Sequence, residues 1–502
     1  MDLELSRKQF DCYRAEVPLV LTIEEAAESI VPDRSPDAAR IVDVSACLQL
    51  RSQTIADGRL VAAGTVKMTV LYVAEDVPGI RTLDCDVPFE HSAKLPDGCK
   101  NACVEGRICD SEVRLMNPRK LYIRVNIDWR ITPYLEMSFT TCGEIIEEKR
   151  YAIQTLCEAY DVSLIRAVQE DEFAFSDEMT IPGGREIAEL LCSRAKMRVT
   201  EAKALGSKIV LKGVACVSLL YATGDGTLCA YAEELPFSQL FDAETEYDES
   251  SVSASLSLSE CEIHTADDRI VQVRLHLNAF FTLRSTEHVF CITDLYSTVF
   301  DLDAQLDTVS LPQEPQTVIT SQSVREQIET GTEVKSVLAA DVCFGSVGVR
   351  QDGDMLSLRA SATLSALYLD EADTPLSVHR RIEVTAETNA NGEAQATLEN
   401  VCAGDVTATV NASGIELRFP ADFTLVSMKT EKCECLSELS AEPMQMEDDA
   451  PSLVLRALDE GETLWDVAKQ YRTTAETILS ANELTESSLL EAGSMLLIPR
   501  SR

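Results

Sequence analysis

The chain has 502 residues, a length that predicts three or four domains rather than a single core. Its 84 acidic and 44 basic side chains give a net charge of −40, which disfavours nucleic acid and anionic lipid as partners. The hydrophobic fraction of 45% is typical of globular protein, and the sequence contains no apolar run of about 18 residues that could span a membrane.

The N-terminal segment MDLELSRKQFDCYRAEV has no basic stretch followed by an apolar one. We therefore expect no signal peptide and a protein that stays in the cytoplasm.

One sequence pattern then occurs three times along the chain. Its copies read GTVKMTVLYVAED, GVACVSLLYATGD and ASATLSALYLDEA. Each copy contains a Leu-Tyr pair, and the tyrosines Tyr72, Tyr221 and Tyr368 lie 149 and 147 residues apart. A polar turn and another alternating segment precede each copy, and a turn and a further strand-like segment follow it. The pattern predicts three tandem units of about 148 residues.

Within each copy, apolar side chains alternate with mixed ones. In the first copy Val66, Met68 and Val70 fall on one face of a strand, and Leu71 falls on the other. A period of two predicts half-buried antiparallel strands. Turns such as ADGR and RQDGD favour hairpins, because Gly and Asp tolerate positive φ. The predicted fold is mainly β, with three tandem all-β sandwich-like or barrel-like domains followed by a small α+β module.

The pattern also predicts where these units begin and end. The first β unit is expected at 1–160, the second at 161–310 and the third at 311–428. The pieces IEEAAESI and GREIAELLCSRAK have helical periodicity and are predicted as helical lead-ins to the repeats. Residues 429–452 are polar and end in acidic side chains, which is typical of a linker. Residues 453–502 are predicted as a separate module.

This tail combines two short strands with two helix starts. Thr463 with Asp466 has the spacing of a capping box, and Thr473 with Glu476 has the same spacing. LVLRAL before the helices and GSMLLIP after them predict the strands. The order strand, helix, helix, strand implies a thin core, and we expect Trp465 to be its anchor.

At these residues the tail resembles the LysM domain, over about residues 453 to 500. The resemblance implies a βααβ fold, which commonly binds N-acetylglucosamine-containing glycans in a groove between the loop after the first strand and the loop before the second. Arg456, Glu462 and Arg472 differ from the aromatic residue, the Asp and the Gly that are usual at their positions. The groove residues that the resemblance implies are Gly461, Glu462, Thr463, Leu464, Asn482, Leu484 and Leu489.

Three β units followed by such a module resemble the SipL family of spore-forming Firmicutes, in which SPOCS domains precede a C-terminal LysM domain. The resemblance rests on the Leu-Tyr strand, the unit length and the domain order. It implies a protein of the mother-cell cytoplasm that works at the forespore and spore-coat surface. It also implies that the LysM domain engages the spore-coat morphogenetic ATPase of the stage IV sporulation protein A type.

Cysteine and histidine usage argues against catalysis and metal binding. The 17 cysteines include no C-x-x-C pair, and their odd number without a secretion signal is typical of a reducing compartment. The sequence contains no Gly-x-Ser-x-Gly elbow, no His-Glu-x-x-His motif and no phosphate-loop motif. We therefore predict structural thiols, no catalytic residue, no metal and no cofactor. The five histidines are His91, His264, His276, His288 and His379.

Three functions remain open at this point. The first is a non-enzymatic structural adaptor of the spore envelope, whose LysM domain binds the morphogenetic ATPase or other coat proteins. The second is a cell-wall protein that binds peptidoglycan through the same groove. The third is a cell-wall hydrolase, because LysM domains often accompany such enzymes, but the chain lacks the residues that a hydrolase needs.

Overall fold

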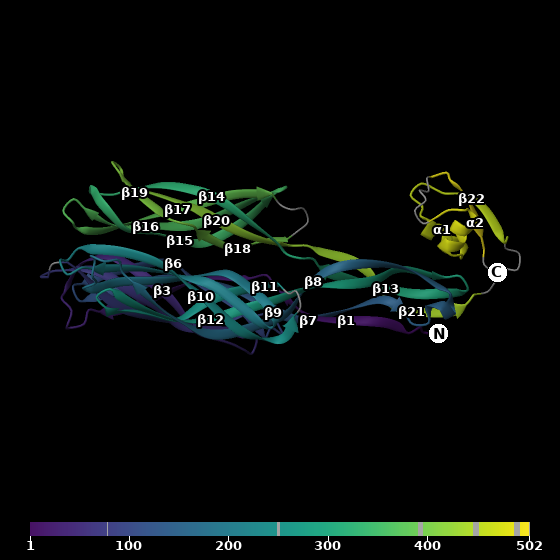
Figure 1. Ribbon diagram of the computed structural model, residues 1–502, viewed down its shortest axis with the longest axis horizontal. Helices are drawn as coiled ribbons and strands as arrows, with labels where there is room; N and C mark the ends of the chain where they lie inside the picture. Colours follow the sequence, from purple (N-terminus) through teal and green to yellow (C-terminus); the bar gives the residue numbers. More distant parts are fainter. Residues whose placement is uncertain (78, 248–250, 390–394, 445–450, 486–491, 501–502) are drawn as a thin grey trace.

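The computed structural model shows an elongated molecule with a body, a narrow stalk and a small helical module at the end of the stalk (Figure 1). Strands make up 78% of the chain and helices 4%, which confirms the prediction of a mainly β fold. The N-terminus lies at the same end as the module. The structure describes all residues except 78, 248–250, 390–394, 445–450, 486–491 and 501–502.

Each unit of the body consists of two small antiparallel groups of strands that pack around a core. In the first unit one group is a meander, and the other places a strand on either side of a long central strand. The apolar faces of both meet in one buried cluster, which includes Tyr72 and Trp129. The meander strands are β3 (Ala38–Ala56), β4 (Arg59–Ala74) and β5 (Ile80–Lys94), and the second group is β2 (Leu19–Ile30), β7 (Lys120–Ile145) and β6 (Asn101–Asn117).

The second and third units repeat this arrangement around clusters of their own. In the second unit the first two meander strands form one element, β9 (Glu189–Ala222). Its halves lie side by side, since a Cβ on Gly213 would stand 2.5 Å from the carbonyl oxygen of Arg198. The other strands of this unit are β10 (Leu228–Tyr247), β11 (Ser251–Asp267), β12 (Ile270–Ser297) and β8 (Ile153–Thr180). Those of the third are β15 (Val334–Asp352), β16 (Met355–Asp370), β17 (Pro375–Asn389), β18 (Gln395–Ala403), β19 (Thr407–Asn411), β20 (Gly414–Met428) and β14 (Gln316–Glu329).

The two residues of the repeated Leu-Tyr pair pack in different clusters. The three tyrosines lie in the cores of their own units. The preceding leucines, Leu71, Leu220 and Leu367, point to the opposite face of their strands and pack in one buried cluster with Val42 and Leu191. An apolar side chain on the outer face of a strand is therefore explained by contact between units, which alternation within one unit does not reveal.

The stalk is built from strands that continue beyond the body. β7 and β12 extend past their units, and β1 (Leu5–Ala15) and the first half of β8 pair with these extensions. The short 3-10 helix η1 (Glu148–Tyr151) turns the chain from β7 to β8. β13 (Phe300–Pro312) pairs with β21 (Thr430–Pro443), and apolar side chains of all these strands form one buried cluster.

The strands of the stalk cross the domain boundaries that the sequence predicts. Residues 430–443, which the sequence predicts as part of a linker, form strand β21, and Cys433, Leu436 and Leu439 are buried. The predicted boundaries at 160 and 310 fall inside β8 and β13. The linker prediction fails because the polar side chains of 430–443 alternate with apolar ones, and that period of two is the pattern of a strand with one buried face.

Neither of the two predicted helical lead-ins is a helix. IEEAAESI belongs to β2, where Ile23 and Ala27 pack against the first core while Glu24 and Ala26 are exposed. GREIAELLCSRAK contains the start of β9. Ala and Glu favour helices by intrinsic propensity, but pairing with β7 along the full length of β2 outweighs a preference of a few tenths of a kcal/mol per residue.

The tail has the predicted strand, helix, helix, strand order. Thr463 caps the first helix with both arms of the capping box in place. The second helix begins one residue later than the spacing of Thr473 and Glu476 predicts: Thr474 is its N-cap, and the side chain of Thr474 accepts the amide hydrogen of Thr477. The elements are β22 (Leu453–Ala457), α1 (Leu464–Tyr471), α2 (Ala475–Ala481) and β23 (Met495–Pro499).

Candidate functional site

The loop between β22 and α1 forms one wall of the predicted groove. Gly461 has a φ of +81° and is exposed, and a Cβ placed on it would meet no atom within 4 Å. Thr463 is exposed as well, and its hydroxyl oxygen accepts the amide hydrogen of Asp466 at 3.2 Å. Among the described residues of the predicted groove, these two are exposed and therefore accessible to a ligand.

Glu462 is held inside this loop instead of pointing to solvent. Its side chain is only 16% exposed, and both carboxylate oxygens lie 2.9 and 3.0 Å from Nη2 of Arg456. Arg456 also pairs with Asp459 at 2.8 Å and lies over the ring of Tyr471. The two departures from the usual LysM pattern at 456 and 462 are therefore partners in one ion pair that fixes the loop.

The remaining predicted groove residues are largely structural. Asn482 donates to the carbonyl oxygens of Ile478 and Leu497, each at 2.7 Å, and accepts the amide hydrogen of Leu497 at 2.8 Å, so it ties α2 to β23. Leu464 and Leu484 are half-buried against the core of the module. Leu489 lies outside the described residues.

Trp465 does not anchor the core of the module as predicted. It is half-buried and faces the stalk, where its Nε1 donates to Oδ2 of Asp294 at 2.7 Å. Its ring packs edge-on against Tyr296 with the centroids 5.0 Å apart. The centre of the module is instead formed by smaller side chains: Val467, Ala468, Ile478, Leu496 and Ile498.

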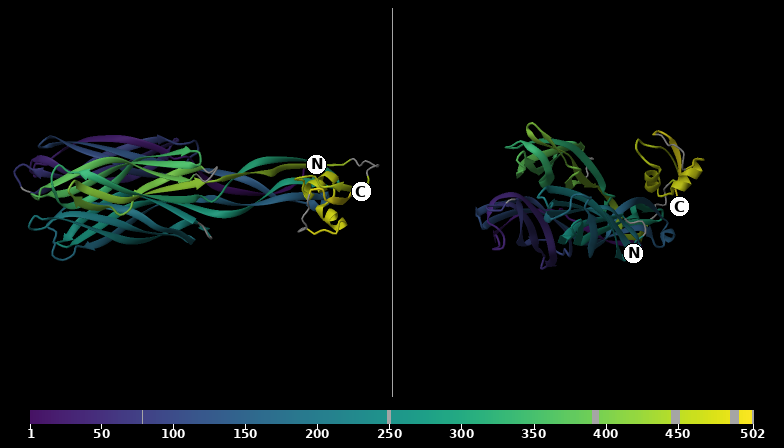
Figure 2. Two further views of the ribbon diagram at one scale, coloured as in Figure 1. Left: turned by 90° about the horizontal axis from the view of Figure 1, so that it is seen from above. Right: turned by 60° about the vertical axis from the view of Figure 1, so that its left-hand side comes forward.

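A second candidate site lies in the body, where the three units face one another (Figure 2). A cavity of about 1840 Å³ is lined by strands of all three units. Its lining contains eight basic and eight acidic side chains, whereas the chain as a whole has 44 and 84. The charges that line this cavity therefore balance, although the molecule as a whole is strongly acidic.

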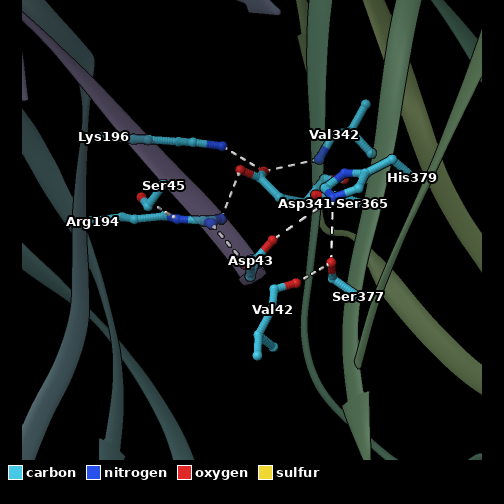
Figure 3. Close-up of polar contacts among 10 residues, drawn as sticks. All are labelled: Val42, Asp43, Ser45, Arg194, Lys196, Asp341, Val342, Ser365, Ser377 and His379. Atoms are coloured by element: carbon cyan, nitrogen blue, oxygen red, sulfur yellow. Dashed lines mark hydrogen bonds and ion pairs between the residues drawn. The ribbon is translucent and has the colours of Figure 1, made fainter. Parts of the chain in front are cut away.

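An ionic network at this junction joins one side chain from each unit (Figure 3). Arg194 of β9 lies between Asp43 of β3, at 3.7 Å, and Asp341 of β15, at 3.4 Å. Its Nε also donates to Oγ of Ser45 at 2.8 Å, and Lys196 pairs with Asp341 at 2.6 Å. Since each unit supplies a charge that the others neutralise, the network favours one relative placement of the three units.

Ser377, His379 and Asp43 lie close together in this network and superficially resemble a catalytic triad (Figure 3). Ser377 Oγ and Asp43 Oδ1 both approach the same ring nitrogen, Nε2 of His379, at 3.5 and 3.8 Å. A triad needs the carboxylate on one nitrogen and the nucleophile on the other. Ser377 moreover donates to the carbonyl oxygen of Val42. The arrangement is that of a contact between units.

The charge of Asp43 gives a testable pH dependence. Burial raises the pKa of Asp43, and the opposing effects of Arg194 and His379 do not cancel it. Because the pKa of Asp43 is higher in the folded chain than in the unfolded chain, the free energy of unfolding decreases as the pH rises above the pKa of the unfolded chain. We expect Asp43→Asn to unfold at a higher temperature than the parent chain at pH 7 and at nearly the same temperature at pH 4.

Thermal unfolding followed by circular dichroism at both pH values measures this difference. Asp303→Asn, on an exposed position of the stalk, serves as the control and should show no such pH dependence. A variant that is less stable than the parent at pH 7 would show that the ion pairs of Asp43 outweigh the cost of its burial.

Comparison with known families places two kinds of domain on the chain. Residues 37–116 and 186–265 match the family described as SipL, SPOCS domain, and residues 459–499 match the LysM domain. No curated protein and no solved structure matches the chain. The matched SPOCS segments run from β3 to β6 and from β9 to β11, so each covers a meander and the strand after it.

The chain thus contains two SPOCS domains of the kind found in SipL, followed by a C-terminal LysM domain. SPOCS and LysM domains are non-catalytic binding domains. Within the part of the chain that the structure describes, no cluster of His, Cys, Asp and Glu side chains is arranged to hold a metal ion. No helix among the described residues is long and apolar enough to cross a membrane.

Proposed function

We propose that this chain is a non-enzymatic structural adaptor of the bacterial spore envelope. Its LysM domain binds a protein of the basement layer of the spore coat, namely the morphogenetic ATPase of the stage IV sporulation protein A type. The three-unit body provides the second attachment surface, for other coat proteins. The proposal places the protein in the mother-cell cytoplasm, at the forespore surface.

The observation that carries this proposal is the pairing of SPOCS and LysM domains in one elongated molecule, with the groove loop open at one end and the body at the other (Figure 1). The junction of the units supports it as well. Its Ser, His and Asp side chains meet without the geometry of a catalytic site.

We also propose that the third unit is a further SPOCS-like domain. β15, β16 and β17 form the same three-stranded meander as β3, β4 and β5, and both contain the Leu-Tyr pair at the end of the central strand. In both meanders that tyrosine points into the core of its own unit and the leucine into the shared cluster. The likeness covers residues 334–389.

Peptidoglycan is the alternative ligand of the LysM groove. The groove loop is exposed at Gly461 and Thr463, which agrees with either ligand. The ion pair between Arg456 and Glu462 favours a protein, because it occupies the Glu462 carboxylate, which would otherwise be free to accept hydrogen bonds from sugar hydroxyls.

A substitution at Gly461 tests the groove as the binding surface. Gly461→Asn places a side chain over open space, and Asn tolerates positive φ better than most residues. We expect it to weaken binding to the coat partner about tenfold, since blocking the centre of an interface costs about 1.4 kcal/mol or more. Binding is measured with the full chain immobilised, against the purified ATPase and against purified peptidoglycan.

Gly226→Asn is the matched control, because Gly226 has a φ of +83° and equally open surroundings but belongs to the second unit. Binding to the ATPase that is lost in Gly461→Asn and kept in Gly226→Asn supports the adaptor. Retention on peptidoglycan with the same dependence on Gly461 would instead establish the glycan-binding alternative.

A further inference from the structure

We propose that the tip of the stalk is an intramolecular binding site for helix α1 of the LysM domain, and that the two form a clamp that holds the groove in a fixed orientation relative to the body. The clamp consists of three residues on each side. Asp294, Tyr296 and Asp301 come from the stalk, and Trp465, Lys469 and Arg472 come from the LysM domain. The clamp itself does not depend on the proposed function. Only its role in presenting the groove to a partner rests on that function.

Tyr296 forms the apolar centre of the clamp. It lies near the end of β12 and is 6% exposed, because it is part of the same buried cluster as the core of the LysM domain. Its hydroxyl donates to the carbonyl oxygen of Thr473 at 2.8 Å, and its ring meets that of Trp465. A stalk residue thus completes the thin core of a domain that has few large side chains of its own.

Asp294 and Asp301 supply the charged part. Asp294 accepts from Trp465 and lies 2.5 Å from Nζ of Lys469. Burial by itself would raise the pKa of Asp294, but Lys469 and Trp465 outweigh it and the pKa is lowered. Asp301 pairs with Arg472 at 2.6 Å. In this strongly acidic molecule, three hydrogen-bond donors of the LysM domain therefore face two carboxylates of the stalk.

The backbone at Arg472 is a second, independent observation. Arg472 is the C-cap residue of α1, with a φ of +53°. Glycine is favoured in such a conformation, and other residues cost about 1–2 kcal/mol there. Arg472 nevertheless occupies this position and directs its guanidinium to the stalk. The contacts of its guanidinium with Asp301 and with Sδ of Met444 offset part of this backbone cost.

The clamp leaves the groove loop free. Gly461 and Thr463 are exposed while Trp465 and Lys469 contact the stalk. A partner that binds the groove therefore does not have to open the clamp. The body and the groove behave as the two ends of one rigid rod, which is a different arrangement from a domain tethered by a flexible linker.

Acrylamide quenching of tryptophan fluorescence in the full chain tests the clamp without any partner. Trp129 is 2% exposed, so the quenchable emission comes from Trp465. The open variant combines Asp294→Ala with Arg472→Gly, and the second change also relieves the backbone at 472. We expect a red shift of the emission and a larger quenching constant in this variant, and small-angle X-ray scattering should show a broader distribution of distances.

Asp303→Ala, on the same strand as Asp301 but without a contact to the LysM domain among the described residues, should behave like the parent chain. Asp301→Arg alone should open the clamp, and Asp301→Arg together with Arg472→Asp should close it again. Equal quenching in the parent and open chains, or no recovery in the charge swap, would overturn the clamp. Because no partner is present, this outcome is independent of whether the groove binds a coat protein.

Discussion

A chain that ends at residue 429 is expected to lose the stalk, whereas a chain that ends at residue 443 is expected to keep it. The difference is strand β21, which pairs with β13 along its whole length and also contacts the N-terminus. The amide hydrogens of Leu3 and Ala441 bond to the carbonyl oxygens of Leu439 and Met1, both at 2.9 Å. Removing β21 therefore leaves two neighbouring segments without partners.

The expected loss of stability is large. Leu436 and Leu439 are 3% and 4% exposed, and burial of each leucine contributes about 1.5–3 kcal/mol. The two together thus account for about 3–6 kcal/mol, a sizeable part of the 5–15 kcal/mol that is typical of a folded domain. Unpaired strand edges also favour aggregation. Thermal unfolding and size-exclusion chromatography of both truncated chains measure the effect.

The truncation after 443 is the control, because it removes the LysM domain and the residues that precede it but none of the stalk strands. Its body should unfold as in the full chain, and its stalk should keep all its strands and lose only the contacts of Asp294, Tyr296 and Asp301 with the LysM domain. Equal stability of the two truncated chains would show that residues 430–443 behave as the linker that the sequence predicts.

Trp129→Ala is expected to destabilise the first unit by about 3–5 kcal/mol, which is typical of removing a buried aromatic side chain. Trp129 is almost fully buried between β6 and β5, and its Nε1 donates to Nδ1 of His91 at 2.7 Å. His91 in turn pairs with Glu25 at 2.7 Å. The substitution therefore creates a cavity and also removes one partner from a hydrogen-bonded chain that joins three strands.

Trp465→Ala is the natural comparison, since the two tryptophans are the only ones in the chain. Trp465 lies at the contact between stalk and LysM domain, so its loss should loosen that contact and leave the unfolding of the body unchanged. Urea unfolding of both variants distinguishes the two roles. A loss of body stability in Trp465→Ala as large as that in Trp129→Ala would contradict them.

The two proposed interaction surfaces lie at opposite ends of the molecule. The body brings three units together through the Leu-Tyr strands and the network of Asp43, Arg194 and Asp341. The stalk holds the LysM domain away from the body (Figure 1). An adaptor that connects a coat basement layer to further coat proteins requires such a separation, because two large partners must bind without colliding.

The alternation within the repeats was sufficient to predict the mainly β fold, and the resemblance of the tail identified the C-terminal LysM domain. Period-two alternation and capping-box spacing are local properties, and they are written into neighbouring residues. The same pattern correctly placed Val66, Met68 and Val70 on the face that packs in a core. It also showed Leu71 on the other face, but it could not say what that leucine would meet.

The stalk, the junction network and the clamp were decided only by the tertiary structure. Each depends on contacts between residues that are more than a hundred positions apart, such as Asp294 with Trp465, Phe300 with Pro443 and Asp43 with Arg194. For the same reason the linker and the two helical lead-ins were predicted wrongly. Propensity describes a segment in isolation, whereas burial against a distant strand contributes more free energy than local preference does.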